Sequence, residues 1–175
     1  MDMKKLILIA GILLLLTGCG AQPSFETLSD EYVQPVSVQL RQMALALPED
    51  AAALTVQSDE GGNLYFCDGY VITVQVLPSG DLNNTLLQAT GFDKEQLPIM
   101  QTLPDGIKRY DWVWSTAGEG EDQVCRGAVL DDGVNHYVLT CMAGASQAQQ
   151  LQEDWQNLFS SFCLLTQEDL IRTGS

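Results

Sequence analysis

Five cysteines are the residues with the most distinctive chemistry in this sequence, and four of them lie well inside the chain: Cys67, Cys125, Cys141 and Cys163. An even number of thiols in an exported domain favours disulfide bonds, and four cysteines allow three connectivities. No C-x-x-C pair is present, which argues against a thioredoxin-like redox site. The wide spacings and the single histidine, His136, do not fit a zinc site. Buried free thiols are the alternative to disulfides at these positions.

The fifth cysteine, Cys19, closes a segment that has the layout of a secretory signal. Lys4 and Lys5 form a positive head, an apolar run of eleven residues occupies positions 6–16, and small or polar residues precede the cysteine. A membrane-spanning helix needs about 20 apolar residues, so this run is too short to remain as an anchor. We therefore expect residues 1–18 to be removed on export.

The last four residues of this segment, Leu16-Thr17-Gly18-Cys19, resemble the lipobox of bacterial lipoproteins. The resemblance implies that the Cys19 thiol receives a diacylglyceryl group and that Cys19 begins the mature chain. Acyl chains such as palmitate would then hold the protein on the outer, extracytoplasmic side of the cell membrane, because each buried methylene contributes about 0.8 kcal/mol. An ordinary secretory signal, in which Cys19 is incidental, is the alternative.

The charge of the chain limits the kinds of molecule that the protein can bind. Without residues 1–18 the protein has 22 acidic and 6 basic residues, a net charge of −16. Such a domain lacks the basic patch that nucleic-acid binding requires, and anionic lipid headgroups would repel it. The acidity fits solubility outside the cell. The 157 residues from Cys19 onwards suffice for one domain with a core.

The sequence contains no recognisable catalytic motif. His136 is the only histidine, and we expect it to be exposed beside the turn at 131–133 rather than to activate a nucleophile. The many carboxylates give no basis for choosing a glycosidase-like pair. The acidic loop 118–122 lacks the alternating oxygen ligands of a calcium loop, and no glycine-rich phosphate loop occurs. The sequence therefore predicts no enzyme activity, no metal site and no cofactor.

Three aromatic residues alternate along a predicted strand at 107–116: Tyr110, Trp112 and Trp114. Alternation places the three rings on one face of a sheet. On an open face they would form an aromatic platform for a sugar or a peptide. We favour the other interpretation, in which they pack under the closing helix beside Trp155 and Phe159.

The elements that would position these residues are mostly short strands. Segments rich in β-branched and aromatic residues, or loosely alternating, predict strands at 38–47, 51–57, 64–77 and 107–116. The segment 64–77 fits two strands or one long bulged strand. Helical spacing predicts a helix at 81–90 that ends at Gly91, followed by a further helical turn at 93–97. Residues 19–37 fit a tether.

A β-hairpin is the clearest structural unit, with strands at 124–130 and 136–142 joined by a turn around Gly133. If the hairpin is centred on Gly133, Cys125 lies directly opposite Cys141 and could bond to it. A one-residue slip of register would instead place these two thiols on opposite faces of the sheet. The remaining bond would join the other two interior cysteines, Cys67 and Cys163.

An amphipathic helix closes the domain. After Ser146, a candidate N-cap, large apolar residues recur every three or four positions. They are Leu151, Trp155, Leu158, Phe159 and Phe162. We expect this stripe to pack on the sheet and residues 166–175 to form a loose tail. The predicted domain, 38–165, is a single α+β fold in which an antiparallel β-sheet carries helices on both faces, an α/β/α sandwich.

Two segments resemble the C-terminal half of PsbP-like proteins: Tyr137-Val-Leu-Thr-Cys141 and Trp155-Gln-Asn-Leu-Phe-Ser-Ser-Phe162. The resemblance spans about residues 38–164. This family is named after an extrinsic subunit of photosystem II, and its fold recurs in small bacterial lipoproteins. The resemblance implies the α/β/α sandwich and, for bacterial members, a binding or assembly accessory rather than an enzyme. No residue of the photosystem role carries over to this chain.

Together these features predict a membrane-anchored, extracytoplasmic lipoprotein that acts as a non-enzymatic binding or assembly accessory for a protein or small-ligand partner. The alternative is a cell-surface hydrolase that uses paired carboxylates. A solute-binding protein fits less well, because such proteins usually have two lobes and this chain has room for one.

Lipidation at Cys19 can be tested directly. Cells that express the full chain should incorporate a palmitate analogue into it, because the Cys19 thiol is the acceptor. The Cys19→Ser variant should lose this label. Equal labelling of the two forms would show that Cys19 is not the acceptor.

Overall fold

The computed structural model describes residues 41–54, 62–166, 169 and 171, and its centre is a seven-stranded antiparallel sheet. In spatial order the strands are β2 (Ala52–Leu54), β3 (Gly62–Cys67), β4 (Tyr70–Pro78), β8 (Asn135–Gly144), β7 (Gln123–Asp131), β6 (Lys108–Thr116) and β5 (Ile99–Thr102). The predicted signal segment 1–18, the lipidation site Cys19 and the tether 19–37 lie outside the described residues.

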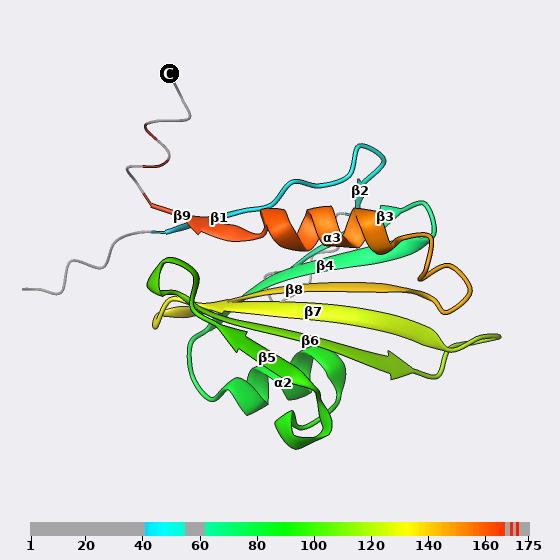
Figure 1. The fold of residues 1–175 in the computed structure, drawn as a ribbon, viewed down its shortest axis with the longest axis horizontal. Helices are drawn as coiled ribbons and strands as arrows, with labels where there is room; N and C mark the ends of the chain where they lie inside the picture. The colour runs from blue at the N-terminus through cyan, green and yellow to red at the C-terminus, as the bar shows by residue number, and fades with distance from the viewer. Residues whose placement is uncertain (1–40, 55–61, 167–168, 170, 172–175) are drawn as a thin grey trace, which may run out of the picture. The chain divides into compact units, whose positions relative to one another are not determined.

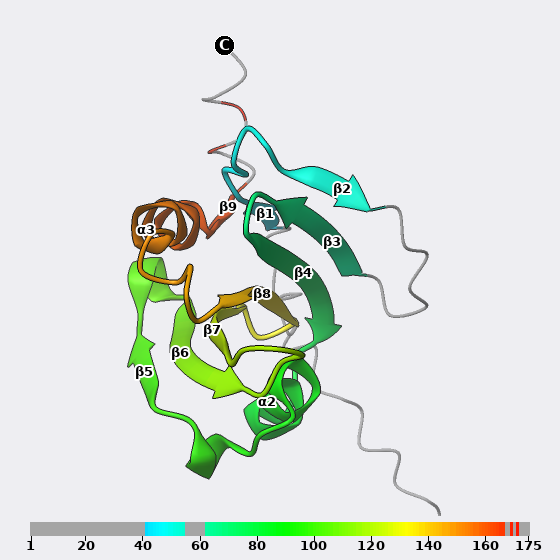
Figure 2. The same ribbon diagram turned by 90° about the vertical axis from the view of Figure 1, so that its right-hand side faces the viewer.

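Each face of the sheet carries one helix (Figures 1 and 2). Helix α3 (Gln152–Ser161) lies on one face and helix α2 (Leu82–Thr90) on the other. This arrangement confirms the predicted α+β fold with an antiparallel sheet between helices. Among the described residues, no helix is long and apolar enough to cross a membrane.

Helix α2 has the boundaries that its sequence predicts. The side chain of Asp81 caps the first turn by accepting a hydrogen bond from the backbone N–H of Asn83 at 3.0 Å. Gly91 ends the helix in the left-handed conformation, with φ 79°, and its N–H donates to the carbonyl of Leu87. Glycine adopts this conformation without steric cost, which explains the sharp stop.

The α3 face carries the larger core. Trp155, Leu158 and Phe159 are buried against β4 and β8, and the rings of Trp155 and Tyr70 meet edge to face at 6.3 Å. Burial of such large side chains is a main source of the stability of a domain of this size. The predicted apolar stripe of the closing helix is therefore confirmed as a packing surface.

Helix α3 starts later than Ser146, so the predicted N-cap is wrong. Residues 145–151 form turns, and the helix begins at Gln152. The backbone N–H and hydroxyl of Ser146 instead donate to the carboxylate of Glu121, at 3.0 and 3.1 Å. Glu121 comes from the predicted acidic loop 118–122, so this loop is tied to the segment that leads into α3.

The aromatic strand faces α2, not α3, and the predicted packing partner is therefore wrong. Trp112 is only 2 % exposed and lies in a second core with Leu86 of α2 and Val138 of β8. Trp114 stacks on Trp112, with ring centroids 6.3 Å apart. The Trp112 ring covers Gly127 on the neighbouring strand, where a Cβ atom would collide with it. Because Trp112 is buried, the three rings do not form an open platform.

The β7–β8 hairpin has a register one residue away from the predicted one. Asp131 pairs with His136, so Cys125 lies opposite Met142 rather than opposite Cys141. The cause is the turn: the carboxylate of Asp132 accepts backbone hydrogen bonds at 2.8 and 2.7 Å from the two residues that precede His136, and this fixes an even-numbered connection. The Cys125 and Cys141 thiols consequently point to opposite faces of the sheet.

Three short strands differ from the sequence prediction. β5 and β9 (Cys163–Leu165) were not predicted, because three or four residues are too few for a clear alternating pattern. The predicted strand at 38–47 is reduced, among its described residues, to β1 (Gln42–Ala44). β1 pairs with β9 in a separate two-stranded sheet instead of joining the main one. The predicted strands at 64–77 are β3 and β4, joined as a hairpin.

Candidate functional site

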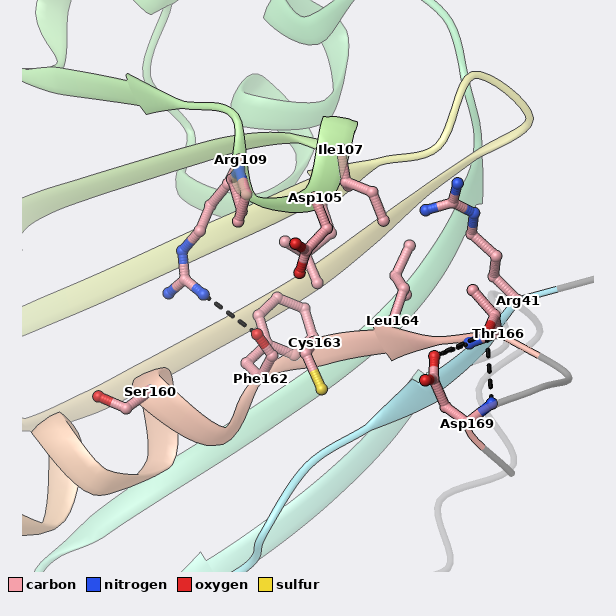
Figure 3. A pocket seen from close by; sticks show the side chains of 12 residues that line it. Arg41, Asp105, Ile107, Arg109, Ser160, Phe162, Cys163, Leu164, Thr166 and Asp169 are labelled. Atoms are coloured by element: carbon pink, nitrogen blue, oxygen red, sulfur yellow. Dashed lines mark hydrogen bonds between the residues drawn. The ribbon is translucent and has the colours of Figure 1, made fainter. Parts of the chain in front are cut away.

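A cleft of about 570 Å³ opens where α3 ends and the chain enters β9 (Figure 3). Its walls come from the start of β1, the turn at Pro104–Gly106 that joins β5 to β6, and the C-terminal end of α3. The volume falls within the range of small-molecule sites. The lining residues that matter chemically are Arg41, Asp105, Arg109, Cys163 and Asp169.

Arg109 fixes one wall of this cleft through four hydrogen bonds. Its guanidinium donates two hydrogen bonds, of 2.8 and 2.9 Å, to the carboxylate of Asp111. The same group donates to the backbone carbonyls of Phe159 at 2.9 Å and Phe162 at 3.1 Å. These carbonyls belong to the last turn of α3, where the helix leaves them without internal partners and where positive charge is stabilising. Arg109 therefore ties the end of α3 to strand β6.

Arg126 supports the same helix from the next strand. Its guanidinium lies over the ring of Phe159, 4.2 Å from the ring centroid. Arg109 stands on the polar side of β6, opposite its aromatic residues, and Arg126 of β7 pairs with Val113 on that same side. This side faces α3. The polar pair Arg109 and Asp111, two positions apart on one strand, was the sequence signal that could have identified the contact.

Arg41 is the other guanidinium that the structure describes in the cleft, and it differs from Arg109 in its surroundings. No described residue makes a hydrogen bond or an ion pair with it, although its side chain is half-buried. Figure 3 shows its guanidinium extending towards the side-chain ends of Ile107 and Leu164. Burial raises the pKa of the nearby Tyr137, and the positive charge of Arg41 acts in the opposite direction.

The floor of the cleft is apolar. Ile107, Leu130 and Phe162 contribute to it, and all three are at least nine-tenths buried. Leu164 of β9 adds a half-buried side chain beside them. A ligand in this cleft would therefore meet both this hydrocarbon surface and the Arg41 guanidinium.

Two carboxylates complete the lining. Asp169 accepts hydrogen bonds from the backbone N–H and the hydroxyl of Thr166, at 2.9 and 2.7 Å. Asp105 is exposed and occupies the left-handed region, with φ 49°, within the turn that precedes Ile107. A residue with a Cβ adopts this conformation at a cost, so the turn holds Asp105 at the edge of the cleft by its backbone geometry.

Among the described residues, Cys163 is the one thiol that lines the cleft, and none of them is a base placed to activate it. Partial burial raises the pKa of this thiol, Asp169 adds to the rise and Arg109 opposes it. A raised pKa leaves less thiolate, the nucleophilic form, at neutral pH. The geometry therefore does not support nucleophilic catalysis at Cys163.

His136 cannot serve as that base, and its predicted exposure is wrong. The ring is 1 % exposed and lies under α2, on the opposite face of the sheet from α3. Its Nδ1 is 2.7 Å from the hydroxyl of Thr85, and its Nε2 is 3.8 Å from the carboxylate of Asp131. The sequence missed this burial because His136 precedes the visible apolar run of β8 by one position.

All four interior cysteines are free thiols in the structure. Cys125 and Cys141 are buried on opposite faces, which excludes the predicted bond between them in this register. Burial raises the pKa of the Cys67 thiol, and Asp154 in the first turn of α3 adds to the rise, which places Cys67 near that turn, whereas Cys163 follows the last turn. The ten-residue helix, about 15 Å long, separates the two, so the predicted Cys67–Cys163 bond is not formed. Within the described part of the chain, no cluster of acidic, histidine and cysteine side chains could hold a metal ion.

Comparison with known proteins identifies the fold but not a family. No protein-family model and no curated protein matches this chain. The solved cyanobacterial PsbP of Synechocystis is similar with a TM-score of 0.52 and 12 % identity, covering 75 % of this chain and 96 % of that one. This similarity confirms the predicted PsbP-like fold.

Two further solved structures are more distant. The Saccharomyces cerevisiae Ran-binding protein Mog1p has a TM-score of 0.46 and 13 % identity, over 71 % of this chain and 95 % of that one. LpqN, involved in cell envelope biogenesis of Mycobacterium tuberculosis, has a TM-score of 0.45 and 15 % identity, over 76 % and 87 %. At such scores we draw no functional argument from them.

The role of Arg109 in fixing the cleft can be tested by measuring how much its side chain contributes to the free energy of unfolding. Arg109→Gln should lower the free energy of unfolding by about 3 kcal/mol, because it leaves a mostly buried Asp111 carboxylate and two helix carbonyls without their partner. Lys108→Gln is the matched control: its exposed ion pair with Asp131, at 3.8 Å, should contribute less than about 1 kcal/mol. Urea denaturation measures both, and equal midpoints for the two variants would contradict the assignment.

Proposed function

We propose that this protein is a membrane-anchored, extracytoplasmic lipoprotein that acts as a non-enzymatic binding or assembly accessory, and that the cleft at the end of α3 is its binding site. The observation that carries the proposal is the Arg41 guanidinium, which has no partner among the described residues and lies beside an apolar floor. A cleft that combines an accessible guanidinium with a hydrocarbon surface can orient a ligand without transforming it.

The chemistry of the cleft supports binding over catalysis. Nucleophilic catalysis requires a base within hydrogen-bond reach of the nucleophile. The one histidine of the chain is buried on the α2 face beside Thr85, away from Cys163. The PsbP-like fold is consistent with an accessory role, as the resemblance of the sequence to that family implies, although a shared fold does not by itself fix a function.

One observation favours the alternative, a hydrolase. Asp105 and Asp169 line the same cleft. Most glycosidases use two carboxyl groups that flank the scissile bond as their catalytic pair. Asp169, however, is already bound by Thr166. The two functions make different predictions for a carboxylate variant: Asp105→Asn should leave binding intact in an accessory protein and abolish turnover in a hydrolase.

Photo-crosslinking from the edge of the cleft tests the proposal in cells. A benzophenone side chain introduced at position 103 of the full chain should form a discrete adduct, because Leu103 is exposed beside the cleft-lining Pro104. The same group at position 87 is the matched control, since Leu87 is exposed on α2, across the sheet. A Leu164→Asp substitution on the cleft floor should abolish the adduct from position 103.

Two results would contradict the proposed function. Equal adducts from positions 103 and 87, or an adduct that is unaffected by Leu164→Asp, would show that the cleft is not the binding site. Hydrolysis of a nitrophenyl glycoside or ester by the purified chain, lost in Asp105→Asn, would show that the protein is an enzyme.

A further inference from the structure

This acidic protein has few basic residues, and the structure describes five of them: Arg41, Lys94, Lys108, Arg109 and Arg126. The three arginines line the cleft or the smaller hollow of about 280 Å³ beside it, which shares Arg109 and Ser160 with the cleft. The chain as a whole has a net charge of −15. Three of the five basic residues that the structure describes therefore lie at the candidate site.

Only one of these arginines is available to a ligand in the cleft. Arg109 is saturated by Asp111 and the carbonyls of α3, and Arg126 lies over the ring of Phe159. Arg41 has no partner among the described residues. A half-buried guanidinium gains from a planar anion that can accept two parallel hydrogen bonds, and a carboxylate has that geometry.

The other groups of the cleft restrict the anion further. The apolar floor of Ile107, Leu130 and Leu164 fits a hydrocarbon body, not a hydrated inorganic ion. Asp105 and Asp169 at the same cleft would repel a second negative charge. The net charge of the protein likewise disfavours a polyanion or a strongly acidic partner.

We infer that the cleft binds a small amphipathic monocarboxylate, whose carboxylate pairs with Arg41 and whose apolar body lies on the floor formed by Ile107, Leu130 and Leu164. The inference rests on the proposed binding function and specifies its ligand class. The same chemistry is offered by a free organic acid and by the C-terminus of a peptide that ends in an apolar residue.

Calorimetric titration of the full chain in neutral phosphatidylcholine nanodiscs tests the inference with defined probes. Phenylacetate should bind, while phenylacetamide, which has the same body without the charge, should not. Phenylsuccinate, with a second carboxylate, should bind more weakly than phenylacetate because of Asp105 and Asp169. N-acetylphenylalanine mimics the C-terminus of a peptide, whereas phenylacetate mimics a free organic acid. The probe that binds more tightly shows which of these two ligands the cleft prefers.

Two charge-matched variants locate the site. Arg41→Gln should weaken phenylacetate binding by about tenfold or more, as expected for loss of a charge-assisted hydrogen bond. Lys94→Gln removes the same charge from an exposed position in the short helix after α2 and should leave the affinity unchanged. Arg41→Gln should also unfold at the same urea concentration as the parent, because Arg41 has no partner to lose among the residues that the structure describes.

The outcomes separate this inference from the function on which it rests. If phenylacetate and phenylacetamide bind equally, or Arg41→Gln and Lys94→Gln weaken binding equally, the carboxylate assignment is wrong. If none of the probes binds while the crosslink from position 103 persists and depends on Leu164, the cleft is a binding site for a different chemistry. If both fail, the proposed function fails with the inference.

Discussion

The guanidinium of Arg109 holds strand β6 and the end of helix α3 together. It lies on strand β6, neutralises Asp111 on the same strand, and closes the last turn of α3 by binding its free carbonyls. A helix end that is fixed in this way sends the following chain in a defined direction, here into β9. β9 in turn pairs with β1, with Cys163 opposite Ala44, and so brings the start of β1 and Arg41 to the cleft. The candidate site thus depends on one mostly buried ion pair with two extra hydrogen bonds.

The two faces of the sheet have different properties because of this arrangement. The α2 face is closed: Trp112 fills the space over Gly127, and the buried His136 is bonded to the helix through Thr85. The α3 face is closed beneath Trp155 but open beyond the end of the helix, where a cleft replaces further packing. A binding function is therefore most simply placed at the open end of α3. The lipid anchor that we propose at Cys19 would hold this site outside the membrane.

The sequence predicted the long elements well and the connections between them poorly. The stripe of α3, the Asp81 and Gly91 boundaries of α2, and the hairpin strands are local patterns, and local patterns are what sequence periodicity reports. The one-residue error in the hairpin register arose because the side chain of Asp132 decides the turn length, which no hydrophobic pattern reveals. The face that each helix covers depends on chain path and not on periodicity, so the aromatic strand was assigned to the wrong helix.

The site itself was the least predictable part. Arg41 and Arg109 are 68 positions apart in the sequence, and they line one cleft only because β1 pairs with β9. These two strands are so short that the sequence does not reveal their pairing. The most direct test of the site is an NMR experiment that detects intermolecular NOEs between the ring protons of phenylacetate and ¹³C-labelled methyl groups of the protein. We predict NOEs to Ile107, Leu130 and Leu164, and their loss in Arg41→Gln. NOEs confined to the exposed Leu87 of α2, or unchanged by Arg41→Gln, would contradict the placement of the ligand site at the end of α3.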